Sequence, residues 1–148
     1  MRSTRWLIIA APVVVALSCI AALVSIWARW PHQFGGHGDP DHMLADFVSS
    51  GTALAPPLFI LVVFAVAALQ VRRTDLWGSV ACVVIIALSA LMIVASLGEA
   101  MAGHTPDVPR AVQVISGASG TVAGALLALL SLGSLRQRHL ARREDVRH

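Results

Sequence analysis

The sequence has few charges, few aromatic residues, only two cysteines and neither lysine nor tyrosine. Charged residues make up 13% of the 148 residues, whereas soluble domains usually carry about 25%. Hydrophobic residues make up 57%, so water is not expected to be the main solvent of this chain. The segments between the apolar runs are too short to fold independently. We therefore expect one domain, residues 1–148, that lies in a lipid bilayer.

The absence of lysine leaves eleven arginines as the basic residues, a bias typical of GC-rich bacterial genomes. A nucleic-acid-binding protein needs basic residues clustered on one folded face, whereas these arginines flank apolar runs. Membrane topology explains that placement, and nucleic acid is not an expected partner. Cys19 and Cys82 fall inside apolar runs at different depths, so we expect no disulfide between them. Each is expected to be a small buried side chain.

Four apolar runs are long enough to cross a bilayer as helices, at about 6–28, 54–71, 77–98 and 112–135. The connection from Arg72 to Asp75 is so short that the second and third helices must be antiparallel neighbours. The predicted fold class is an all-α membrane protein, a four-transmembrane-helix antiparallel bundle. Residues 136–148 are expected to form a basic tail.

The first long loop contains a short amphipathic segment. Asp39 and Pro40 are typical of a helix start, with Asp39 as the N-cap and Pro40 in the first helical position. Apolar residues then share one helical face, at Met43, Leu44, Phe47 and Val48. We expect a short helix that lies in the outer interface of the membrane.

The distribution of arginine predicts the orientation. If the N-terminus is cytoplasmic, nine arginines lie on the cytoplasmic side: Arg2, Arg5, Arg72, Arg73, Arg136, Arg138, Arg142, Arg143 and Arg147. The outer segments then hold Arg29 and Arg110 only. This asymmetry predicts a multi-pass protein of the cell membrane with both termini in the cytoplasm. The four tryptophans, Trp6, Trp27, Trp30 and Trp77, all fall at predicted membrane edges, as an interfacial belt requires.

The fourth apolar run carries small residues at intervals of four, at Ser116, Gly120, Gly124 and Ala128. Such a row allows another helix backbone to come close and gain dispersion contacts. The pattern predicts helix packing, either against another helix of the same chain or against a second copy. Leu127 is expected to face lipid beside this row.

The predicted outer segments hold most of the histidines and carboxylates. His42 and Asp46 stand one helical turn apart, and Glu99 and His104 belong to the other outer segment. Histidine and carboxylate are ligands for Zn²⁺ and other divalent metals, so these four residues are candidate metal ligands at the outer face. No complete metal signature is present, and solvated side chains without a common ligand are the simpler interpretation.

The central parts of the predicted spans contain no ionisable residue, which argues against a proton-coupled transporter. They also contain no histidine for a membrane haem, and the chain has no nucleophile elbow or phosphate-binding loop. We therefore favour a non-enzymatic packing, assembly or accessory membrane protein, with the bilayer and a membrane-protein partner or a second copy as its partners. The alternative is an outer-face enzyme or ligand-binding protein that acts on a lipid-like or small substrate through His42, Asp46, Glu99 and His104.

The orientation can be tested with cysteines introduced one at a time. A cysteine at Gly36 or Ala102 should react with a membrane-impermeant thiol reagent in whole cells, and one at Gln137 should not. The native Cys19 and Cys82 should stay unreactive because both lie in apolar runs. The reverse labelling pattern would contradict the predicted orientation.

Overall fold

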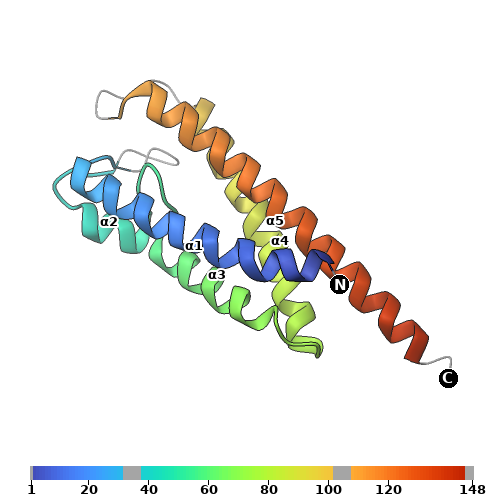
Figure 1. Ribbon diagram of the computed structural model, residues 1–148. Helices are drawn as coiled ribbons and strands as arrows, with labels where there is room; N and C mark the ends of the chain where they lie inside the picture. The colour runs from blue at the N-terminus through green and yellow to red at the C-terminus, as the bar shows by residue number, and fades with distance from the viewer. Residues whose placement is uncertain (1, 32–37, 102–107, 146–148) are drawn as a thin grey trace.

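The computed structural model describes residues 2–31, 38–101 and 108–145, with all their side chains except those of residues 2, 99, 100 and 142–145. Within these ranges the chain forms five α-helices and no β-strand (Figure 1). They are α1 (Arg2–Ala28), α2 (Met43–Ser49), α3 (Leu58–Gln70), α4 (Leu76–Met101) and α5 (Arg110–Asp145). The all-helical prediction is confirmed for the part of the chain that the structure describes.

Three of these helices are long and apolar enough to cross a membrane. The stretches that meet this requirement are Ser3–Ala28 in α1, Leu76–Gly98 in α4 and Arg110–Ala141 in α5. They support the prediction of a membrane protein. Helix α5 continues to Asp145, so the first ten residues of the predicted tail, 136–145, are helical. Cys82 is buried as expected, whereas Cys19 is exposed on the surface of α1, contrary to its expected burial.

Helix α3 is shorter than the predicted second crossing. It begins at Leu58 rather than near residue 54, because the residue before a proline is forced out of the helical region. This restriction applies to both Ala55 and Pro56, and Pro57 itself is extended, with φ −53° and ψ 148°. The 13 residues of α3 span about 20 Å, less than the roughly 30 Å hydrocarbon core of a bilayer.

The segment between α2 and α3 packs against the end of α1. Thr52 and Pro31 form an isolated antiparallel bridge, and the Ala53 N–H donates to the Trp30 carbonyl at 3.3 Å. The Thr52 N–H donates to the Ala55 carbonyl at 2.8 Å, which closes a tight turn. Gly51 has a φ of +95°, and a Cβ there would lie 2.8 Å from the Ala55 carbonyl oxygen. Glycine is therefore required at this turn.

The four longer helices contact one another in a ring. Helix α1 contacts α3 and α5, and α4 contacts the same two helices. The α1–α3 pair and the α4–α5 pair meet near the start of α1 and diverge toward the other end (Figure 1). We call the first the basic end; it holds the start of α1, the α3–α4 turn and α5 from Ser134 onward. The opposite end, with α2, is called the α2 end.

Buried side chains from all four longer helices form one hydrophobic core near the basic end. They are Leu7 and Ala11 of α1, Phe64, Ala67 and Ala68 of α3, Val71 after α3, Ala81, Cys82 and Ile85 of α4, and Leu127 of α5. Leu127 is 0% exposed, so its predicted position facing lipid is wrong.

Candidate functional site

The contact between α4 and α5 is built from small residues. Buried and half-buried residues of α5 recur at alternating intervals of four and three, at Gln113, Gly117, Gly120, Gly124, Leu127, Ser131, Ser134 and Arg138. The same alternation occurs on α4, at Gly78, Cys82, Ile85, Ser89, Met92 and Ser96. This is the spacing with which two helices pack side by side in a left-handed coiled coil. We call these two rows of residues the α4–α5 seam.

The two helices of the seam are antiparallel and keep one register. A Cβ added to Gly120 would overlap the Ser96 hydroxyl, and one added to Gly124 would lie 3.0 Å from the Ser89 carbonyl oxygen. Nearer the basic end, the Cys82 thiol donates to the Ser134 hydroxyl at 3.8 Å. Glycine thus lets the two backbones approach where any larger residue would separate them.

Two of the four residues predicted to form the packing row lie in this seam. Gly120 and Gly124 face α4 of the same chain, whereas Ser116 and Ala128 are half-buried beside the seam. A row at intervals of four drifts around a straight helix, so it cannot follow one neighbour along its whole length. The alternating spacing of Gly117, Gly120 and Gly124 was visible in the sequence and is the signal that would have found the seam.

At the basic end the seam also holds α1 and α3. The hydroxyls of Thr4 on α1 and Ser134 on α5 lie 2.9 Å apart and share a hydrogen bond. The Arg138 guanidinium donates to the carbonyls of Val71 and Arg73, which follow α3. These groups would otherwise lack partners, since the last carbonyls of a helix have none within it. A Cβ on Gly78 would collide with both the Arg73 carbonyl and the Arg138 guanidinium, so glycine leaves room for the hydrogen bond between them.

At the α2 end, two of the predicted metal ligands, His42 and Asp46, lie beside Asp39 and Asp41. Helix α2 begins at Met43, and its N-cap is His42, so the prediction that Asp39 caps this helix is wrong. Asp39 instead accepts from the Asp41 N–H at 2.9 Å, and its Oδ2 lies 2.6 Å from Nδ1 of His42. The Asp46 carboxylate accepts from the Asp39 N–H at 2.8 Å. The three side chains thus close the turn that precedes α2.

A second contact connects this turn to α1. The Arg29 guanidinium lies 3.4 Å from the Asp41 carboxylate, and both side chains are exposed. Arg29 has a φ of +55°, unusual for a residue with a side chain, and it stands directly after the last residue of α1. An exposed ion pair of this kind contributes little stability by itself.

The pKa values at this turn shift in opposite directions. The hydrogen bond that His42 donates to Asp39, and the negative charge of Asp39, raise the pKa of His42 above its ordinary value of 6.5, with smaller contributions from the charges of Asp41 and Asp46. The hydrogen bond from His42 and that from the Asp41 N–H lower the pKa of Asp39 below 3.8. The turn is therefore most stable when His42 is protonated and Asp39 is ionised.

The predicted metal ligands fall partly outside the described structure. His42 and Asp46 both lie at the α2 turn, but His42 pairs with Asp39. His104 lies outside the described residues, and Glu99 lies on α4 with its side chain undescribed. Among the residues that are described, no three histidine, cysteine or carboxylate side chains gather closely enough to hold a metal ion. The four-ligand divalent metal site stays a prediction.

The packing of the seam can be tested by enlarging one of its glycines. Gly124→Leu should lower the free energy of unfolding by about 2 kcal/mol or more, because the new side chain must push α4 away. The side chain of Leu129 is exposed, so Leu129→Ala should change the free energy of unfolding by less than about 0.5 kcal/mol. The measurement is thermal unfolding in detergent. Equal effects of the two substitutions would contradict the seam.

The turn before α2 should open as the pH rises. The pKa of His42 is higher in the folded protein than its ordinary value of 6.5. The stability that His42 contributes to the turn is therefore complete below pH 6.5 and is lost as the pH rises through the pKa of the folded state. Hydrogen-exchange protection factors of the α2 amides should fall over that range in the wild type and stay constant in His42→Gln. His139→Gln, at the other end of the molecule, should keep the wild-type profile. A pH-independent wild type would exclude this coupling.

The chain matches no known protein family, no curated protein and no solved structure. What it does must therefore be inferred from its own contacts, chiefly the α4–α5 seam and the two charged ends.

Proposed function

We propose that this chain is a non-enzymatic protein of the cell membrane that crosses the bilayer four times and assembles with a membrane partner or with further copies of itself. Both termini lie in the cytoplasm. The proposal adds α3 to the three long helices as a fourth crossing, and it assigns the exposed surface of α5 as the assembly face.

The return of the chain along α1 supports the fourth crossing. At the α2 end, Ala53 bonds to Trp30, which follows α1. At the basic end, Val71 lies in the same buried cluster as Leu7, near the start of α1. Residues 52–71 therefore run beside nearly the whole of α1, so they cross any layer that α1 crosses. The extended residues before α3 supply the length that this short helix lacks, and such backbone is tolerated where protein covers it.

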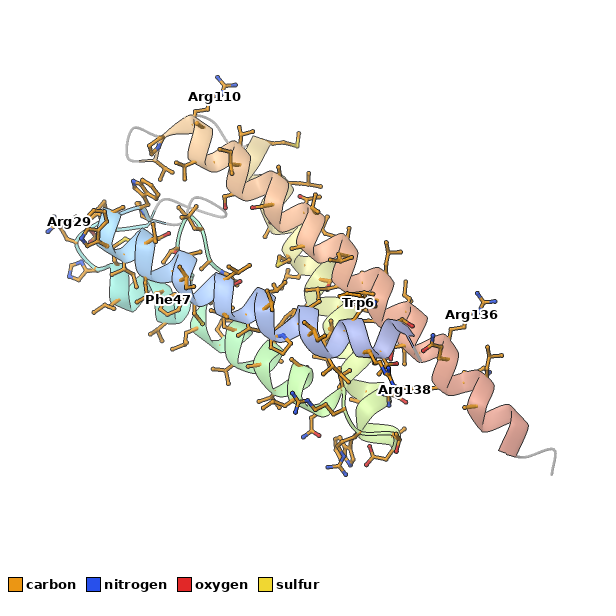
Figure 2. All side chains as sticks on the ribbon, viewed as in Figure 1. Trp6, Arg29, Phe47, Arg110, Arg136 and Arg138 are labelled. Carbon is orange, nitrogen blue, oxygen red and sulfur yellow. The ribbon has the colours of Figure 1, made fainter. Side chains whose placement is uncertain are left out.

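The arrangement of charge supports the orientation. The arginines of the basic end whose side chains are described are Arg5, Arg72, Arg73, Arg136 and Arg138, whereas Arg29 and Arg110 lie toward the other end (Figure 2). Arginine is enriched on the cytoplasmic side of membrane proteins. The basic end, which holds the start of α1 and the C-terminal part of α5, accordingly faces the cytoplasm.

The exposed face of α5 supports assembly. Its predicted packing row is used within the chain, because Gly120 and Gly124 lie against α4. On the opposite side of α5, small residues are exposed at intervals of seven, at Ala111, Ala118 and Ala125. Ala118 and Ala125 lie seven residues apart on this face, and their small side chains let another transmembrane helix approach closely between the larger ones.

The assembly face can be tested by enlarging its alanines. The wild-type chain, purified in mild detergent, should migrate in a complex heavier than its own 15.6 kDa, as measured by light scattering after gel filtration. Ala118→Leu combined with Ala125→Leu should release it from the complex, because the added side chains hold a neighbouring helix away. Ala16→Leu, on an exposed face of α1, is the matched control. A wild-type chain that is monomeric in detergent and in native membranes would refute the proposal.

A further inference from the structure

The basic end carries more positive charge than its own carboxylates neutralise. Among the side chains described there, Arg73 pairs with Asp75 at 2.7 Å. Arg5, Arg72 and Arg136 are exposed and form no ion pair within the described part of the chain. At the α2 end, by contrast, the carboxylates of Asp39, Asp41 and Asp46 outnumber Arg29 and Arg110, and Arg29 pairs with Asp41. The surplus positive charge thus lies at one end of the molecule.

The three unpaired arginines lie at nearly the same depth. Thr4 and Ser134 share a hydrogen bond, which fixes α1 and α5 at this level. Arg5 is one residue after Thr4 and Arg136 is two residues after Ser134, and the helices run in opposite directions. With a rise of about 1.5 Å per residue, the two arginines differ in depth by roughly 5 Å. That is about the thickness of one headgroup layer.

Arg138 places the third arginine in the same layer. Its guanidinium binds the Val71 carbonyl at 2.6 Å, and Arg72 follows Val71 directly. Figure 2 shows Arg136 pointing away from the other helices, so its guanidinium is free to meet a group outside the protein. Arg138 uses its two terminal guanidinium nitrogens within the chain, so the exposed Arg5, Arg72 and Arg136 are the residues available to a ligand.

The surroundings of these arginines match the boundary between headgroups and acyl chains. Trp6 and Trp77 are each 63% exposed at this end. Tryptophan prefers that boundary, where one side of the indole is apolar and the other is wet. Exposed apolar side chains follow one turn deeper, at Ile9 on α1, Val80 on α4 and Leu132 on α5. A ligand at this surface would therefore meet cations above and hydrocarbon below.

We propose that the basic end binds the headgroups of anionic phospholipids, with Arg5, Arg72 and Arg136 as the residues that contact phosphate. Guanidinium groups bind phosphate oxygens with paired, charge-assisted hydrogen bonds. A zwitterionic lipid carries its own cation and cannot neutralise the surplus charge, whereas an anionic lipid can. A soluble polyanion would leave Trp6, Trp77 and the apolar side chains beside them without a partner.

The tryptophans allow each end to be probed separately in the full chain. One variant, Trp27→Phe with Trp30→Phe, keeps the tryptophans of the basic end; the reciprocal variant, Trp6→Phe with Trp77→Phe, keeps those of the α2 end. Each is reconstituted into phosphatidylcholine vesicles that contain acyl-brominated phosphatidylglycerol or acyl-brominated phosphatidylcholine. Bromine quenches nearby tryptophan fluorescence, so the ratio of the two quenching curves measures the preference for the anionic lipid at each end.

The variant that keeps Trp6 and Trp77 should show a preference for phosphatidylglycerol of about fivefold or more, because one surface arginine contributes about that factor. The variant that keeps Trp27 and Trp30 should show a ratio near one. Adding Arg5→Gln, Arg72→Gln and Arg136→Gln should bring the ratio at the basic end to about one. Arg29→Gln with Arg110→Gln is the matched control and should leave it unchanged. Undiminished quenching by brominated phosphatidylcholine verifies that each variant is inserted.

Three outcomes would overturn the proposal. The first is a ratio near one at the basic end with all its arginines present. The second is an anionic preference that survives the triple substitution or is insensitive to high salt, since salt screens exposed charges. The third is loss of the preference when inorganic phosphate or an oligonucleotide is added at constant ionic strength, which would assign the surface to a soluble anion instead.

Discussion

The close approach of α4 and α5 is the contact on which the rest of the fold depends. A bilayer offers no hydrophobic driving force between helices, so their association must come from dispersion contacts and interhelical hydrogen bonds. Gly120 and Gly124 bring the two backbones together. At the basic end the same seam provides Ser134 as a hydrogen-bond partner for α1 and Arg138 as a donor to the end of α3. The other two helices are therefore attached to this pair.

The long helices were predictable from the sequence because their apolar runs are longer than those of helices buried in small soluble domains, and long enough to cross a bilayer. The start of α3 was not predicted correctly. The apolar run in the sequence includes Pro56 and Pro57 and begins at residue 54, so hydrophobicity alone places the start of the helix too early. Prolines act on the residues before them as well as on themselves, and that effect moves the helix start to Leu58. The predicted packing row and the observed seam have Gly120 and Gly124 in common.

The charged groups were harder to assign than the helices. The side of the membrane on which they lie is predicted by counting the charged residues of each loop. Which groups they hydrogen-bond to depends instead on the geometry of the turns. Asp39 was expected to cap a helix, yet it bonds to His42 because the chain makes a turn before α2 begins. Arg138 was counted as one more charge beside an apolar run, although its guanidinium is a structural donor. Contacts between residues 65 or more positions apart leave no local pattern in a sequence.

The pairings of Arg138 and Ser134 also set an order of events during synthesis. Helix α5 is made after the other four helices, so the carbonyls of Val71 and Arg73 have no Arg138 to bind until α3 and α4 have been synthesised. Thr4 waits longer still, since it meets Ser134 across 130 residues of chain. Until then these groups must be hydrated, which is possible at the membrane surface and costly deeper in the hydrocarbon. Helix α5 therefore holds α1 and the end of α3 in place, and a chain that stops short of Ser134 would lack both contacts.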